Sequence, residues 1–107
     1  MIIMLEGSRA KAFELQQRLI ELLPSSFDVQ VAKDVITSSY IAFYLIVSKG
    51  SMSADLRWGD THISTNDSIS FIIERHYETN PWDARTAPRI TGVKNVVDWL
   101  IDEFEER

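Results

Sequence analysis

The segment from Ser38 to Ser48 is apolar on both of the alternating sets of positions that a β-strand sends to opposite faces of a sheet. Most of its residues are β-branched or aromatic, which favours a strand. A strand that is apolar on both faces is typical of the middle of a sheet that is covered on both sides. We therefore predict a central strand here, within a small folded α+β domain.

Two other segments carry apolar residues at steps of three and four, which is the period of a helix. The first runs from Ser8 to Leu23, with Ser8 placed to act as N-cap and Pro24 placed to end the helix. The second runs from Val93 to Glu106 and has the clearest apolar stripe in the chain. The pattern therefore predicts one amphipathic helix near each end.

Further strands are predicted between these helices. Residues alternate between apolar and polar from Phe27 to Lys33, which indicates a half-buried strand. A third strand is predicted from Ala54 to Trp58, and Thr61 to Thr65 could continue it beyond a bulge. The segment from Ser68 to Tyr77 fits both a strand and a helix, and its β-branched content favours the strand.

Residues 78–92 contain Pro81, Pro88 and Gly92 and are expected to form a long ordered loop. The resulting order is helix, three or four strands, helix. Consecutive strands joined by short turns favour an antiparallel sheet. We predict one α+β domain over residues 1–107, with a sheet of three to four strands flanked by the N-terminal and C-terminal helices.

The composition narrows the classes of protein that fit this pattern. The chain has 107 residues and no cysteine, which fits one domain and excludes disulfides, thiolate catalysis and cysteine-bound metals. No segment approaches the roughly 20 apolar residues of a membrane helix, and the first residues lack the basic start of a signal peptide. We expect a soluble cytoplasmic protein with no membrane partner.

The formal net charge is −5, and the excess of acidic residues is concentrated towards the C-terminus. Proteins that bind nucleic acid non-specifically need a basic surface to neutralise phosphates. Direct binding of nucleic acid is therefore not expected to be the main role. An acidic surface instead favours solubility or attracts a basic surface on another protein.

The first cluster of candidate functional residues lies around the end of the third predicted strand. Arg57 and Asp60 could bind a polar ligand beside Trp58, and His62 could transfer a proton near neutral pH. The alternative, which we favour, is a strand edge where Trp58 packs and the charged residues face water or pair with one another.

This region resembles a pattern in small proteins of bacteriophages and mobile elements. In that pattern, a strand with Ser-x-Tyr precedes a strand that reads approximately Leu-Arg-Ile-Ser-Asp-His. Ser38 and Tyr40 match the first part, and the second part is matched approximately by Leu56, Arg57, Asp60 and His62. The resemblance implies a short sheet in a protein of unknown biochemical role, and no functional residue is carried over from it.

A second cluster lies in the predicted loop, where aromatic residues alternate with charges of both signs. Tyr, Trp and Arg dominate binding hot spots because they combine a large contact area with a polar tip. The loop residues expected to contact a partner are Tyr77, Trp82, Arg85 and Arg89. In the alternative interpretation, Tyr77 and Trp82 anchor the loop on the core and the charges are solvated.

The second helix offers a third surface. Asp98, Asp102, Glu105 and Glu106 form an acidic ridge at steps of three and four residues, which could mimic a run of phosphates. An ordinary solvated helix face is the favoured alternative. Trp99 lies off the apolar stripe, and an exposed Trp there would mark an interface and fit a homodimer.

Catalytic and metal-binding patterns are weak. The two histidines, His62 and His76, could be joined by Asp60, Asp67 or Glu74, but no metal-ligand spacing is present. There is no nucleophile elbow and no glycine-rich phosphate loop. We expect no catalytic residue, no metal and no cofactor, and a protein that is not an enzyme.

The leading hypothesis is a non-enzymatic protein that binds and inhibits or regulates a larger protein. Arg57, Trp58 and the loop residues would make the contact, and the acidic helix would steer the chain towards a basic partner, such as a nucleic-acid-binding protein. An origin in a phage or mobile element, as for anti-CRISPR proteins, fits by analogy of size and charge. One alternative is a nucleic-acid-binding module, because the order helix, three strands, helix resembles the double-stranded RNA-binding domain. A small His/Asp enzyme or metal protein is the other.

Overall fold

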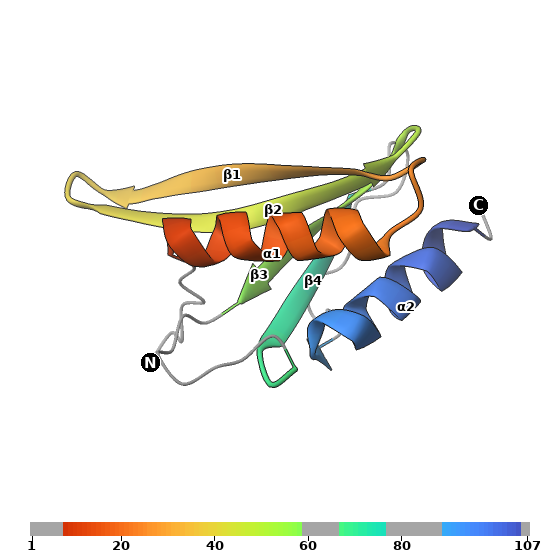
Figure 1. Cartoon of the computed structure of the whole chain (residues 1–107). Helices are drawn as coiled ribbons and strands as arrows, with labels where there is room; N and C mark the ends of the chain where they lie inside the picture. Colours follow the sequence, from red (N-terminus) through yellow and green to blue (C-terminus); the bar gives the residue numbers. More distant parts are fainter. Residues whose placement is uncertain (1–7, 59–66, 77–88, 106–107) are drawn as a thin grey trace.

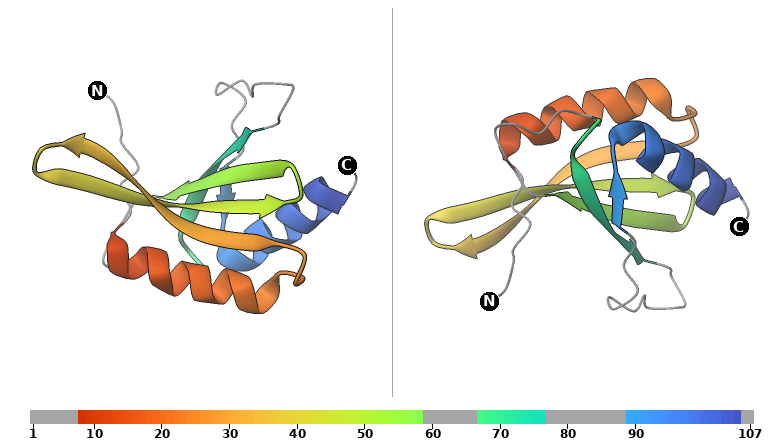
Figure 2. Two further views of the ribbon diagram at one scale, coloured as in Figure 1. Left: turned by 90° about the horizontal axis from the view of Figure 1, so that it is seen from above. Right: turned by 90° about the horizontal axis from the view of Figure 1, so that it is seen from below.

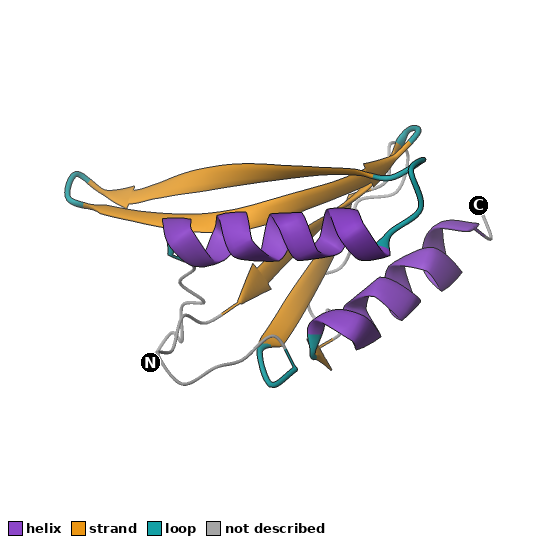
Figure 3. Cartoon of the chain, viewed as in Figure 1, coloured by secondary structure: helices purple, strands orange, loops and turns teal. Residues whose placement is uncertain are grey.

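Five strands form one antiparallel sheet in the order β1-β2-β3-β4-β5, in a computed structural model that describes residues 8–58, 67–76 and 89–105. Each strand therefore lies next to its neighbours in the sequence (Figures 1 and 3). The strands are β1 (Asp28–Thr37), β2 (Tyr40–Lys49), β3 (Met52–Trp58), β4 (Ser70–His76) and β5 (Arg89–Thr91), and the helices are α1 (Arg9–Leu22) and α2 (Val93–Glu105).

The structure confirms the predicted α+β fold. Its sheet has five strands, whereas three to four were predicted. The ambiguous segment forms β4, as its β-branched content indicated. The additional strand, β5, lies inside the segment that was predicted to be a loop. It is only three residues long, and Ile90 pairs with Phe71 of β4 and packs on the core.

The predicted central strand, β2, lies inside the sheet. It pairs with β1 along nearly its whole length and with β3 from Leu45 to Lys49. Both helices, however, lie on the same side of the sheet (Figure 2). Among the described residues, the helices therefore cover one face of β2, while on its other face Ala42 is buried and Tyr44 and Ile46 are half-buried.

The core fills the space between the sheet and the two helices. Leu45, Leu56 and Phe71 point from β2, β3 and β4 towards the helices and are fully buried. Phe27, just before β1, stacks on Phe104 of α2 with 5.8 Å between ring centroids. The helices contribute Ala12, Leu15, Leu19, Val93, Val96, Val97, Leu100 and Phe104 to the same cluster.

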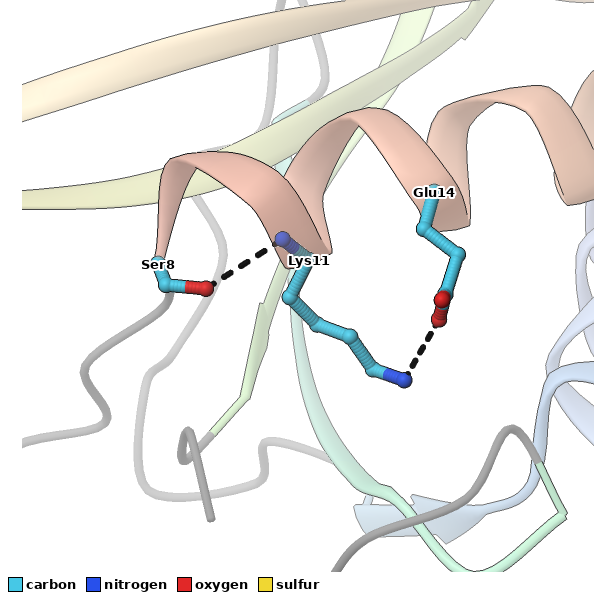
Figure 4. Close-up of polar contacts among 3 residues, drawn as sticks. All are labelled: Ser8, Lys11 and Glu14. Atoms are coloured by element: carbon cyan, nitrogen blue, oxygen red, sulfur yellow. Dashed lines mark hydrogen bonds and ion pairs between the residues drawn. The ribbon is translucent and has the colours of Figure 1, made fainter. Parts of the chain in front are cut away.

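The ends of α1 follow the sequence signals. The backbone N–H of Lys11 donates to Ser8 Oγ at 3.2 Å, so Ser8 is the N-cap, and Lys11 Nζ reaches Glu14 Oε2 at 2.6 Å (Figure 4). At the other end, the N–H of Leu23 donates to the carbonyl oxygen of Leu19 at 2.8 Å, directly before Pro24. The first helix therefore has the limits that its capping residue and proline predicted.

Gly92 joins β5 to α2 in a conformation that favours glycine. Its φ is +90°, and a Cβ atom there would lie 2.9 Å from the backbone oxygen of Asp67. Its N–H donates to the carbonyl oxygen of Ile69 at 2.8 Å. This close approach fixes the position at which α2 starts against the turn before β4.

Candidate functional site

Fifteen described side chains share the side of the sheet that faces away from the helices. Neighbouring residues of a strand point to opposite faces, and the core-cluster residues of each strand identify the helix side. We call this set the helix-free face; it consists of Asp28, Gln30, Ala32, Asp34, Ala42, Tyr44, Ile46, Ser48, Ser53, Asp55, Arg57, Ser70, Ile72, Arg89 and Thr91.

Four residues of the helix-free face lie side by side across four strands. Arg57 of β3 is the register partner of Ile72 of β4, and Ile72 is the partner of Arg89 of β5. On the other side of Arg57, its guanidinium carbon lies 4.1 Å from the ring centroid of Tyr44 on β2. We call Tyr44, Arg57, Ile72 and Arg89 the arginine row.

The guanidinium of Arg57 contacts both Asp34 and Tyr44. Its Nη1 donates to Asp34 Oδ2 on β1 at 2.6 Å, and its plane lies over the Tyr44 ring. The side chains of Arg57 and Asp34 keep 25% and 38% of their surface exposed, so the ion pair is accessible from solvent.

Arg89 is at the far end of the arginine row and is exposed. Among the side chains that the structure describes, no carboxylate forms an ion pair with it. Two strand spacings separate the backbones of β3 and β5, which is roughly 10 Å. The half-buried side chain of Ile72 lies between the two arginines, so the row presents an aliphatic centre with a cation on either side.

This face therefore combines the residue types that recognise other molecules. Tyr44, Ile46 and Ile72 are half-buried without belonging to the core cluster, and arginine and carboxylate groups surround them. An aromatic and aliphatic centre within a polar margin is the usual composition of a binding surface.

Of the contact residues predicted from the sequence, the structure places two on the same face and buries a third in the core. Arg57 and Arg89 share the helix-free face. The direct contact predicted for Trp58 was wrong, because its side chain is 0% exposed and packs edge-on against Phe71, with ring centroids 6.2 Å apart. Residue alternation along β3 sends Trp58 to the helix side, next to Leu56, and Arg57 to the other side.

The predicted acidic ridge is described only in part. Asp98 and Asp102 are exposed on α2, and the backbone of Glu105 ends that helix. Trp99 is half-buried and packs on the core, so it does not form the exposed patch that would mark an interface. Tyr77, Trp82, Arg85 and Glu106 lie outside the described residues, as do Asp60 and His62.

Sequence reasoning missed the neighbours of Arg57. Tyr44 and Ile72 were assigned to strands, but their contact with one arginine depends on the register between strands, which no local pattern gives. The sequence did contain one signal for the helix-free face. In β3, Ala54, Leu56 and Trp58 alternate with Asp55 and Arg57, which separates an apolar side from a polar side.

Other classes of site have little support in the described ranges. There, His, Asp and Glu residues do not gather in a group of three or more that could bind a metal. Neither α1 nor α2 has the length and apolar character that crossing a membrane requires.

The chain matches no protein-family model, no curated protein and no solved structure. The functional interpretation therefore comes from the chain's own residues and their geometry.

Proposed function

We propose that this chain is a non-enzymatic protein that binds, and thereby inhibits or regulates, another protein through the helix-free face of its sheet. The observation that carries the proposal is the arginine row, in which Tyr44, Arg57, Ile72 and Arg89 lie side by side across four strands. Tyr and Arg are the residue types most enriched at binding hot spots.

The arrangement of Arg57 lowers the cost of binding. A free arginine loses rotamer entropy when a partner immobilises it, which costs about 0.5–1.5 kcal/mol for each side chain. Asp34 and Tyr44 already restrict the Arg57 side chain. Less freedom therefore remains to be lost when a partner docks.

The charge of the whole chain complements the row. The net charge of −5, with Asp98 and Asp102 exposed on α2, attracts a partner that has a basic surface, such as a nucleic-acid-binding protein. The arginine row then contacts an aromatic, carbonyl or carboxylate group within that partner's surface. In this proposal the charge accelerates the encounter and the row holds the complex together.

One observation favours a second candidate function. A sheet face with a tyrosine ring and arginines is also a platform on which the bases of single-stranded nucleic acid stack. The net charge opposes this, because affinity for phosphates depends on cations. We therefore keep nucleic-acid binding as the alternative.

Affinity capture with matched variants separates these functions. The immobilised chain, an Arg57→Ala/Arg89→Ala double variant and an Arg18→Ala variant are exposed to a lysate of cells that carry the gene, and bound molecules are identified by mass spectrometry and by RNA staining. Arg18 is an exposed arginine of α1 that pairs with Glu21, so it controls for the loss of charge alone.

We expect a protein that the wild type and Arg18→Ala capture and that the double variant loses. A protein captured equally by all three would contradict the role of the row. Recovery of RNA alone, with binding that weakens steeply as salt rises, would establish the alternative.

A further inference from the structure

The outer edge of β1 has a row of backbone groups available for pairing. β1 pairs with β2 on one side, and its other side is an edge of the sheet. Gln16 Nε2 of α1 donates to the carbonyl oxygen of Val29 at 2.9 Å, so the backbone groups of Val29 point outward. Backbone directions alternate along an antiparallel strand, so those of Val31, Lys33 and Val35 point outward as well.

These three residues lie beyond the contact with Gln16. Among the described residues, no group bonds to their outward N–H or carbonyl groups. The closed end of the β1–β2 hairpin also extends past the first turn of α1 (Figure 1). The edge from Val31 to Val35 therefore has the geometry that lets an extended segment add to a sheet.

A largely apolar hollow of about 540 Å³ lies beside this edge. Phe13, Val31 and Phe43 supply its apolar walls, and Lys33 stands at its margin. Phe13 is 45% exposed, and Val35, farther along the strand, is 68% exposed. Side chains that project from an added strand at every second residue would cover these apolar surfaces.

The margin of the hollow is positively charged, although the molecule is acidic. The guanidinium carbon of Arg9 lies 5.6 Å from the centroid of the Phe13 ring, and both Phe13 and Lys33 line the hollow. In the described ranges neither cation has a carboxylate partner, whereas Lys11, Arg18 and Arg57 each pair with one. A ligand of this edge is therefore expected to carry negative charge.

We propose that the β1 edge binds an extended segment of another protein as a sixth strand. Backbone groups of the segment bond to Val31, Lys33 and Val35, its alternate apolar side chains enter the hollow, and a carboxylate near one end faces Arg9 or Lys33. This contact is separate from the arginine row, which lies on the helix-free face of β2 to β5.

A second copy of the chain fits this edge poorly. Two-fold antiparallel pairing centred on Lys33 places two lysines directly opposite, and pairing centred on Asp34 places two aspartates opposite. Pairing centred on Ala32 leaves the two lysines as diagonal neighbours. Like charges across strands are destabilising, and lysine on an edge strand is a common device against self-association.

The test uses a synthetic peptide of alternating valine and threonine with a glutamate at each end, added to the isotope-labelled chain. We expect amide NMR shifts at Val31, Lys33 and Val35. Two further peptides carry backbone N-methyl groups on the valines or on the threonines. Only one set of N–H groups can face β1, so one peptide should lose at least tenfold in affinity and the other less than threefold.

Two variants of the chain test the same backbone bonds by changing the protein instead of the peptide. Lys33→Pro removes an outward N–H without removing a bond to β2 and should weaken binding at least tenfold. Lys33→Ala keeps that N–H and should lose about threefold. Exchanging the glutamates of the peptide for lysines should weaken binding at low salt, and this difference should vanish near 1 M salt.

Three results would overturn the proposal: no shifts at millimolar peptide, equal loss with both N-methylated peptides, or shifts at Tyr44 and Ile72 in place of the edge. Self-association in sedimentation that protects the same edge amides would also overturn it, because the occupant would be a second copy. The Arg57→Ala/Arg89→Ala variant should bind the peptide normally, so failure here is distinguishable from failure of the arginine row.

Discussion

Trp58 carries a buried polar atom that has no hydrogen-bond partner among the described residues. Its indole Nε1 lies among apolar side chains on the helix side of β3. An unsatisfied buried donor costs about 1–3 kcal/mol, so the packing of the indole must outweigh that cost. At this position the packing of the Trp58 ring stabilises the fold, and its N–H group does not.

This balance predicts a difference between two substitutions of Trp58. Trp58→Phe removes the unsatisfied N–H together with part of the packing, and we expect a loss of stability of no more than about 1.5 kcal/mol. Trp58→Ala removes the whole ring and should cost about 3–5 kcal/mol. Urea unfolding followed by circular dichroism measures both. Equal losses would mean that the N–H has an acceptor in solution.

Two glycines with positive φ provide a second comparison. Gly50 has φ +63° and no atom within 4 Å of the position that a Cβ would occupy, whereas a Cβ at Gly92 would meet a backbone oxygen at 2.9 Å. We expect Gly50→Ala to cost about 1 kcal/mol, from conformational strain alone. Gly92→Ala should cost clearly more, about 2–4 kcal/mol, because the backbone itself must move. Similar losses in thermal or urea unfolding would contradict the close contact at Gly92.

The elements differ in how strongly local sequence determines them. The two helices have a cap, a stop or an apolar stripe within their own residues, and both were predicted almost to the residue. β4 was predicted from its β-branched content. β5 was missed because three residues are too few for a period, and it forms only because β4 offers an edge to Arg89 and its neighbours.

The candidate site was less predictable than the fold for the same reason. The alternation in β3 separates Arg57 from Trp58, which sequence alone could have shown. The row that joins Arg57 to Tyr44, Ile72 and Arg89 depends on the registers of three strand pairs. Such registers are set by pairing between residues far apart in the sequence, so no short segment of the sequence indicates them.

The first turn of α1 offers a test of which local contact matters. Ser8→Ala removes the acceptor for the N–H of Lys11 and should cost about 1 kcal/mol. Glu14→Gln removes the carboxylate that pairs with the Lys11 ammonium in this turn, and surface pairs at this spacing contribute about 0.2–0.5 kcal/mol. Denaturant unfolding of both variants checks the order. A larger loss from Glu14→Gln would show that the ion pair, not the cap, stabilises the turn.

The acidic residues of α2 and the arginine row lie in different layers of the molecule. Asp98 and Asp102 are exposed on α2, in the helix layer, whereas the arginine row lies across the sheet. Long-range charge mainly changes association rates, and groups buried in an interface mainly change dissociation rates. The proposed binding function therefore has a kinetic signature.

Once a protein partner is identified, Asp98→Asn/Asp102→Asn should slow association severalfold at low salt and leave dissociation nearly unchanged. Arg89→Ala should instead accelerate dissociation at least tenfold. Surface plasmon resonance at two salt concentrations measures both rates. The reverse assignment, with the acidic residues controlling dissociation, would place the interface on α2.

The placement of both helices on one side of the sheet has a consequence for how such a chain can diverge. The residues that hold the fold together and the residues of the arginine row alternate along the same strands without sharing side chains. Mutations can therefore accumulate at the recognition positions while the hydrophobic interior stays intact. A lineage built on this scaffold could exchange one target for another and still fold.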